Sequence, residues 1–312
     1  MLLVVILLLV AIAGVIGSTG SRQIGVGAGP IALIRIEGAI VAGQSSSSIF
    51  GGQAIGSEEI VGEIERAMED DQVKAILLRV NSPGGSAAGS QEIYNAVTRA
   101  KKQGLKVVVS MADLAASGGY YVSANADRIY ANPATVTGSI GVISMHENLS
   151  GLFGKLGVQT ETIKSGKLKD MGSPMGPLSD EARQVIKGLV MQIYDQFVTA
   201  VAEGRKMKPE AVRRLADGRI YSGQQAKQIG LVDELGGMQE ALAGAGKLVG
   251  VKGRPGYKEY RAPSLWRRLL AGGAAGAAPG PVAVVRGGML YDTYAAQLVP
   301  GPWRIQPRAE ER

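Results

Sequence analysis

The chain has 312 residues, of which 46% are hydrophobic, so it is long and apolar enough to bury a substantial core. It contains no cysteine, which excludes a disulfide framework, a thiol nucleophile and a zinc–thiolate site. With one histidine, His146, a zinc peptidase or a Ser/His/Asp triad is disfavoured, and a hydrolase would need another base. The net charge of +7 comes from lysines and arginines spread along the chain without a base-stacking motif, which argues against a nucleic-acid partner.

The two ends of the chain differ in composition from its middle. Residues 1–17 carry no charged side chain, and as a helix rising about 1.5 Å per residue they would span roughly 25 Å. We expect a transmembrane anchor there; the alternative is a cleaved signal peptide, although the basic start typical of one is missing. Residues 18–30 are predicted to be a Gly/Ser-rich linker, residues 31–250 the folded domain, and residues 251–312 a poorly ordered tail rich in Gly, Ala, Pro and Arg.

Within the folded domain, apolar runs alternate with amphipathic segments. Strands are predicted at 31–41, 75–80 and 105–110, and helices from Ser57 as N-cap, over 87–100 and 116–124, and from Ser179. The Gly/Ser-rich run 44–56 is predicted to be a mobile loop. This alternation predicts an α/β fold of stacked ββα or βαβ units around a mainly parallel sheet.

Two glycine-rich turns follow predicted buried strands: Asn81–Gly85 (NSPGG) and Ala116–Tyr121 (ASGGYY). Ligands of open α/β sheets gather beyond the carboxyl ends of the strands, so both turns are expected to line one site. Paired glycines allow backbone N–H groups to approach a substrate and form an oxyanion hole. Alone, NSPGG is an ordinary Pro-Gly turn, and Ser117 at a helix start is an ordinary N-cap. As a nucleophile, Ser117 would need a base.

The candidate bases are lysines. His146 lies in the polar stretch MHENL and shows no obvious pairing with an orienting acid, so we interpret it as structural. A lysine can act as a base when burial disfavours its charged form. The segment Ile163–Pro174 offers Lys164, Lys167 and Lys169, and each of them alone would pass for a solvated surface charge. The residue pattern by itself does not choose among the three.

A resemblance to a known family distinguishes among the three lysines. Over residues 31–237 the chain resembles the short, single-repeat form of the signal peptide peptidase A family. Four stretches carry the resemblance, in order: NSPGG, MADLAASGGYYVSANADRIYANPATVTGSIGVI, IKSGKLKD and ADGRIYSGQQAKQIGLVDELGG. It implies that Ser117 is the nucleophile and Lys169 the general base, and that Gly84 and Gly118 supply the oxyanion N–H groups.

The same resemblance implies the fold and the setting. The expected fold is the Clp protease/crotonase-like arrangement of stacked ββα units. The implied activity is cleavage of remnant signal peptides and other hydrophobic peptides at the extracytoplasmic side of the membrane, without a metal or other cofactor. A homo-oligomeric ring is expected, with the dyad shared between protomers. The chain departs from the family pattern in its tail and in the lack of basic residues at its start. A non-proteolytic membrane scaffold or a crotonase-like acyl-CoA enzyme is the alternative function.

Overall fold

The computed structural model of the chain describes residues 26–48, 51–253 and 255–260. These residues fall into two compact units, residues up to 142 together with those from 193 onward, and residues 143–192. We call them the first and the second unit. The predicted anchor at 1–17 and the tail beyond residue 260 lie outside the described residues. Within the described ranges, no helix has both the length and the apolar character needed to cross a bilayer.

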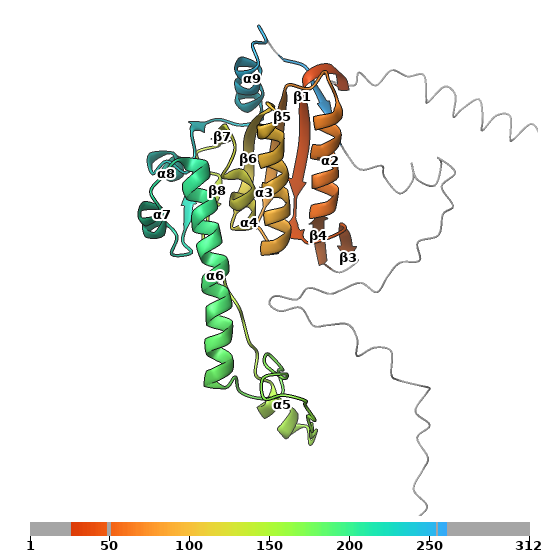
Figure 1. The fold of residues 1–312 in the computed structure, drawn as a ribbon, viewed down its shortest axis with the longest axis vertical. Helices are drawn as coiled ribbons and strands as arrows, with labels where there is room; N and C mark the ends of the chain where they lie inside the picture. Colours follow the sequence, from red (N-terminus) through yellow and green to blue (C-terminus); the bar gives the residue numbers. More distant parts are fainter. Residues whose placement is uncertain (1–25, 49–50, 254, 261–312) are drawn as a thin grey trace, which may run out of the picture. The chain divides into compact units, whose positions relative to one another are not determined.

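A largely parallel sheet forms the centre of the first unit (Figure 1). Its strands, in spatial order, are β10 (Glu234–Leu235), β7 (Arg128–Ala131), β6 (Lys106–Ala116), β5 (Ala75–Ser82), β1 (Val26–Glu37) and β11 (Tyr257–Glu259). All neighbours in this order pair in parallel. The C-terminal end of β6 also pairs with β8 (Val136–Gly138), which pairs antiparallel with β9 (Ile220–Ser222). The prediction of an α/β fold with a mainly parallel sheet is confirmed.

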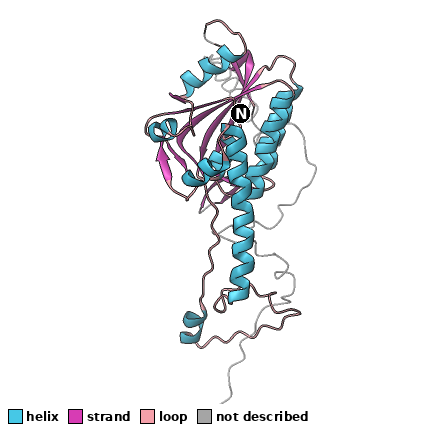
Figure 2. Cartoon of the chain, turned by 60° about the vertical axis from the view of Figure 1, so that its left-hand side comes forward, coloured by secondary structure: helices cyan, strands magenta, loops and turns pink. Residues whose placement is uncertain are grey.

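Helices cover both faces of this sheet, as Figures 1 and 2 show. On one face lie α2 (Ser57–Glu69), α3 (Ala87–Lys102), α4 (Gly118–Ser123) and the C-terminal part of α6 (Asp180–Arg205); on the other lies α9 (Met238–Leu248). Along β1, Ile34 and Ile36 face the first layer, and Ile31 and Leu33 face α9. Because alternate residues of a strand point to opposite faces, an apolar run buried on both sides is what this position requires. The short helices α7 (Pro209–Leu215) and α8 (Gly223–Gln228) also belong to this unit.

Two predicted boundaries, the end of β6 and the start of α4, were wrong, and so was the loop predicted over residues 44–56. Strand β6 continues past the expected end at Ser110 to Ala116, so α4 begins only at Gly118. The segment 44–56, expected to be a mobile loop, contributes β3 (Ser46–Ser48) and β4 (Gly51–Gly56), and β4 pairs with β2 (Ala39–Val41). Glycine and serine disfavour strands intrinsically, but backbone pairing to a neighbouring strand overrides that preference here.

The start of the expected tail is also part of the sheet. Strand β11 lies inside the segment predicted as tail, and it pairs with β1, which begins at Val26 inside the predicted linker. The Arg35 Nε atom donates to the Glu259 carboxylate at 2.8 Å and fastens the two strands. Such a short strand leaves almost no periodic signal in a sequence, because its position depends on a partner more than 200 residues away.

The two predicted helix caps had opposite outcomes. The Ser179 hydroxyl accepts a hydrogen bond from the Ala182 N–H at 3.2 Å, as an N-cap should. Ser57 is instead the first residue of α2, and its buried hydroxyl bonds to Glu92 and accepts from the Gly43 N–H. The hydroxyl of Ser57 therefore joins α2 to α3 and to the loop after β2, and it does not cap α2.

Candidate active site

The two glycine-rich turns lie in contact at the carboxyl ends of β5 and β6. A methyl group placed on the Gly84 α-carbon would lie 2.4 Å from the Gly118 nitrogen and 2.9 Å from the Ser117 Cβ. A methyl group on Gly118 would lie 3.2 Å from the Gly85 nitrogen. These two turns thus approach each other at backbone distance, which only glycine at both positions allows.

Strand β2 holds the first of these turns in place. The Ile40 N–H donates to the Gly84 carbonyl at 2.9 Å, and the Ser86 N–H donates to the Ile40 carbonyl at 2.8 Å. Gly85 lies against the same strand, since a methyl group on it would sit 2.1 Å from the Ile40 oxygen. Gly84 and Gly85 have φ angles of 92° and 150°, which L side chains rarely adopt. Nothing in the sequence indicated that residues 39–41 support this turn.

The backbone donors at this contact differ in availability. The Gly84 N–H donates to the Ser82 hydroxyl at 3.1 Å. The N–H groups of Gly118 and Gly85 have no acceptor among the residues that the structure describes. Gly118 stands at the first position of α4, where an N–H has no intrahelical partner, and Gly85 is exposed. The two donors without an acceptor in the described chain are therefore the N–H groups of Gly118 and Gly85, and Gly85 is the residue after the predicted Gly84.

Ser117 has the backbone of a strained residue. Its φ and ψ are 52° and −121°, a left-handed conformation that is costly for any residue other than glycine. An ordinary N-cap has extended backbone and accepts a hydrogen bond on its side chain, and Ser117 does neither. Its N–H donates to the Gly138 carbonyl at 2.9 Å, and its side chain is half-buried. The interpretation of Ser117 as a mere helix cap is therefore excluded.

A second strained serine follows Gly138. Ser139 has a φ of 50°, and its N–H donates to the Arg219 carbonyl at 2.8 Å. Because Gly138 accepts the Ser117 N–H, Ser139 belongs to the same small region as Ser117. Strained non-glycine residues cluster at functional sites, so Ser139 joins the candidate site on structural grounds. Its sequence context, Thr-Gly-Ser, indicates only a turn, so Ser139 could not be singled out from the sequence.

The three candidate lysines lie in the second unit and have different partners. Lys164 donates to the Asp170 carboxylate at 2.7 Å, and this hydrogen bond lowers the pKa of Asp170. Lys167 forms an ion pair with Glu181. The Lys169 side chain is exposed, and within the described part of the chain it has no hydrogen bond or ion pair. Of the three, only Lys169 has an ammonium group that is not held by a carboxylate.

The second unit buries almost nothing. Its regular structure consists of α5 (Ser150–Lys155) and residues 180–192 of α6, and Ala182 is its one buried residue among those described. Large apolar side chains are exposed instead, and Ile163 is 94% exposed. The others are Ile143, Met145, Leu152, Leu156, Val158, Met175, Val185, Leu189 and Met191. An exposed apolar surface of this extent is typical of an interaction site.

His146 makes a contact inside the second unit. The Nε2 atom of His146 lies 3.1 Å from the Gly176 carbonyl, and its buried Nδ1 atom has no partner among the described residues. His146 and Gly176 both belong to the second unit, so this contact links two of its loops. No group of His, Asp or Glu side chains in the described ranges is arranged to hold a metal ion.

Comparison with known proteins gives one consistent family. The model of peptidase family S49 matches residues 99–252. A Synechocystis protein named as a protease is 40% identical over 203 residues, which are 65% of this chain and 73% of that protein. An Enterococcus faecium protein named as a signal peptide peptidase is 44% identical over 203 residues. Protease 4 of Salmonella typhi is 39% identical over 224 residues, or 72% of this chain.

The chain spans 59% of the length of the Enterococcus relative and 35% of the Salmonella one. The family match runs from the last residues of α3 through α9 and includes both Ser117 and Lys169. It thus includes the strained serine at the head of α4 and the segment that holds the three lysines. The chain belongs to peptidase family S49, the signal peptide peptidase A family of serine peptidases.

Proposed function

We propose that this chain is a membrane-anchored serine endopeptidase that degrades hydrophobic peptides, including remnant signal peptides, with Ser117 as nucleophile and Lys169 as general base. The observation that carries the proposal is the backbone of Ser117. A serine in a left-handed conformation, with no capping bond and with free N–H groups beside it, is costly to maintain and is explained by catalysis.

In the proposed reaction, a neutral Lys169 amine takes the proton of the Ser117 hydroxyl as its oxygen attacks the peptide carbonyl. The negative charge that develops on the carbonyl oxygen is stabilised by backbone donors. We assign these to the N–H groups of Gly118 and Gly85, because both are free of acceptors in the described chain. The predicted Gly84 contributes differently: its φ of 92° and its lack of a side chain let the two turns meet. When the tetrahedral intermediate collapses, the peptide C–N bond breaks, and the Lys169 ammonium gives its proton to the departing amine. The neutral Lys169 then takes a proton from the water that attacks the acyl-enzyme, and that proton passes back to the Ser117 oxygen as the ester bond breaks.

The proposed site is shared between protomers of a ring. An exposed lysine is normally charged in water, and desolvation by a neighbouring subunit would favour the neutral form that a base needs. The exposed apolar side chains of the second unit support such burial, since a segment without a core of its own gains by covering them. We further propose the Clp protease/crotonase-like fold of stacked ββα units, an anchor at residues 1–17 and an extracytoplasmic peptidase domain. No cofactor is required by this chemistry.

A fluorophosphonate probe tests the assignment. It should attach covalently to Ser117 of the wild-type protein, and attachment should fall by about 10³-fold or more in Lys169→Ala. Lys164→Ala and Lys167→Ala are matched controls from the same segment and should retain labelling. A crotonase-like acyl-CoA enzyme or a scaffold would not need Ser117 and Lys169 together. Labelling that survives in Lys169→Ala but is lost in Lys164→Ala or Lys167→Ala would show that the base is misassigned.

A further inference from the structure

Helix α4 cannot hold its own position. It has six residues, begins with two glycines and is buried throughout, and so short a segment is unstable as an isolated helix. Ser117 immediately precedes it, and the Gly118 N–H opens it. The orientation of α4 therefore sets where the proposed nucleophile and one proposed oxyanion donor point, and tertiary contacts must fix that orientation.

Tyr120 makes the decisive contact. Its side chain is fully buried, and its hydroxyl donates to the Leu231 carbonyl at 2.9 Å. Burial raises the pKa of Tyr120, so the hydroxyl is a protonated donor at neutral pH. The other side-chain hydrogen bond from α4, that of Ser123, ends on the carbonyl of Gly119 within the helix. Among the described residues, only Tyr120 joins α4 to another element by a side-chain hydrogen bond.

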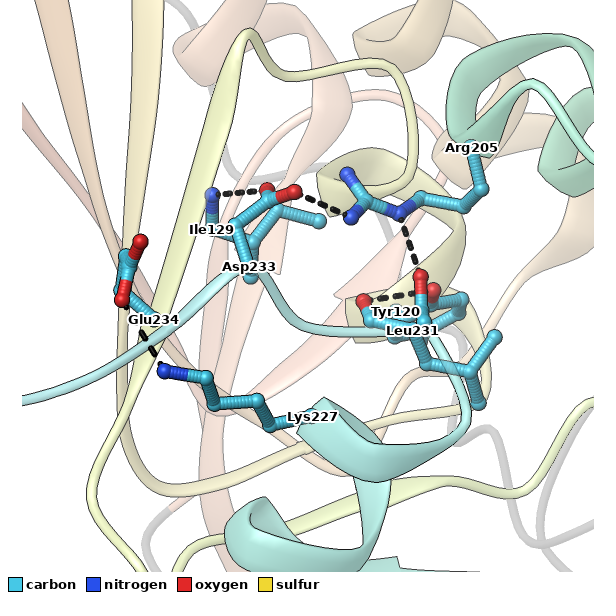
Figure 3. Close-up of polar contacts among 8 residues, drawn as sticks. Tyr120, Ile129, Arg205, Lys227, Leu231, Asp233 and Glu234 are labelled. Carbon is cyan, nitrogen blue, oxygen red and sulfur yellow. Dashed lines mark hydrogen bonds and ion pairs between the residues drawn. The ribbon is translucent and has the colours of Figure 1, made fainter.

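The acceptor of this bond is itself held by an ion pair. Arg205, at the end of α6, donates from Nε to the Gly230 carbonyl at 3.1 Å and from Nη2 to Asp233 at 2.6 Å (Figure 3). The other carboxylate oxygen of Asp233 accepts the Ile129 N–H at 2.8 Å. The Arg205 side chain is 7% exposed, and a buried ion pair is stable only when its remaining donors and acceptors find partners. Here the Arg205 Nε atom and both Asp233 carboxylate oxygens are hydrogen-bonded. Arg205 thus binds residues on both sides of Leu231, Gly230 and Asp233, and this fixes the position of the Leu231 carbonyl.

Apolar contacts also pack against α4. The Tyr121 ring packs against Tyr94 and Phe197, with ring centroids 5.3 and 4.8 Å apart. Gly204 of α6 lies directly against the end of α4, since a methyl group on it would sit 2.3 Å from the Ala124 oxygen. Packing of this kind resists separation of the helices but permits small rotations. A directional hydrogen bond such as that of Tyr120 also restricts these small rotations.

We propose that Tyr120 is a positioning residue for the peptidase reaction: through its bond to Leu231, which Arg205 and Asp233 anchor, it sets the orientation of α4 and hence of Ser117 and the Gly118 N–H. This inference rests on the proposed function of Ser117. Its physical basis is that acyl transfer tolerates little misplacement of the attacking oxygen and the oxyanion donors. The Tyr120 hydroxyl is fully buried and bonded to Leu231, so its loss is expected to leave substrate binding unchanged.

Tyr120→Phe is the test, with Tyr121→Phe as matched control. The two tyrosines are adjacent in α4, but the Tyr121 hydroxyl has no hydrogen bond within the described ranges. Tyr120→Phe should lower kcat on a hydrophobic peptide by about 10- to 100-fold with KM unchanged within about twofold. The rate of Ser117 labelling by the fluorophosphonate should fall in parallel. The pH profile of labelling should keep its shape, because the base is untouched. Tyr121→Phe should match wild type.

The outcomes separate this inference from the proposed function. Equal labelling rates in Tyr120→Phe and Tyr121→Phe, or a raised KM with kcat unchanged, would overturn the positioning role. If Tyr120→Phe does not fold, Asp233→Asn removes the anchor of Leu231 and should show the same loss of kcat. The double variant should lose little more than Tyr120→Phe alone, since both changes act on one bond; fully additive losses would contradict the proposal. Absence of labelling at Ser117 in the wild-type protein would instead overturn the proposed function itself.

Discussion

Gly84 lies so close to Gly118 that a methyl group on its α-carbon would sit 2.4 Å from the Gly118 nitrogen. Gly84→Ala should therefore abolish most activity and cost about 1–3 kcal/mol of overpacking beyond the strain of its φ of 92°. Gly104→Ala is the control, because Gly104 has a φ of 94° and open space around it. That variant should lose only about 1–2 kcal/mol and keep full activity. Urea unfolding and peptide hydrolysis measure both effects, and equal losses in the two variants would contradict the close contact.

Ser117→Gly should be more stable than Ser117→Ala, although both should be inactive. Alanine keeps the steric cost of the left-handed backbone, whereas glycine removes about 1–3 kcal/mol of strain and loses about 0.4–1 kcal/mol through its more flexible unfolded chain. A net gain near 1 kcal/mol is expected in the free energy of unfolding. An alanine variant as stable as the glycine variant would mean that Ser117 is not strained.

Mixing inactive variants tests the shared site. Ser117→Ala and Lys169→Ala protomers should each be inactive alone, and activity should return when they are assembled together. In a mixed ring, some interfaces join an intact Ser117 to an intact Lys169 of the neighbour. With both residues of the dyad in one chain, every site lacks one partner. Rings shown by mass measurement to contain both variants, yet still inactive, would rule out sharing and leave the Ser/Lys assignment intact.

The rate of Ser117 labelling should rise with pH, because only an uncharged amine can accept the serine proton. Lys169→Ala should lose this rise along with most of the rate. Labelling rates of folded protein, measured from mildly acidic to alkaline pH, give the profile. A flat wild-type profile over that range would count against a lysine base.

Acid should weaken the attachment of β11 through Asp70. The Asp70 carboxylate accepts hydrogen bonds from Lys258 at 2.9 Å and from Tyr260 at 2.7 Å, which lower its pKa from 3.8 to about 2. A depressed folded pKa means that Asp70 contributes stability above about pH 4, and that this contribution disappears as pH falls toward 2.

The matching experiment compares Asp70→Asn with Asp71→Asn, since Asp71 is exposed and unpaired within the described residues. The difference in unfolding free energy between wild type and Asp70→Asn should be largest at neutral pH and should vanish near pH 2. Asp71→Asn should show no such trend. A constant difference for Asp70→Asn across this range would mean that its ionisation is not linked to folding.

Much of the parallel sheet could be predicted because β5 and the core of β6 are apolar runs buried on both faces, a signal that is local in the sequence. Strands β4 and β11 could not be predicted, because each forms by pairing with another strand and the local sequence carries no signal of that pairing. The contact of the two glycine turns followed from adjacent parallel strands. The left-handed backbone of Ser117 could not be predicted in this way. Its φ angle is set by the turn between β6 and α4, and the predicted boundary of that turn was wrong.

The candidate site was also limited by what a motif can specify. NSPGG marks a turn with donors, but it does not show that the Gly84 N–H donates to Ser82 while that of Gly85 has no acceptor among the described residues. The Tyr120 bond to Leu231 joins residues 111 positions apart, so no spacing rule reaches it. In the sequence, only the family resemblance distinguished Lys169 from Lys164 and Lys167. The structure adds a local difference, because Lys169 has no carboxylate partner within the described part of the chain.

The pairing of β1 with β11 has a consequence for the order in which the protein forms during synthesis. Pairing between residues so far apart in the chain carries a large loop-closure cost and slows folding. When β1 leaves the ribosome, its partner β5 follows within about 50 residues, but β11, the partner on its other edge, is the last of the described strands to be made. Until then one edge of β1 is unpaired and open to other chains. Shortening the chain before Tyr257 would make that transient exposure permanent.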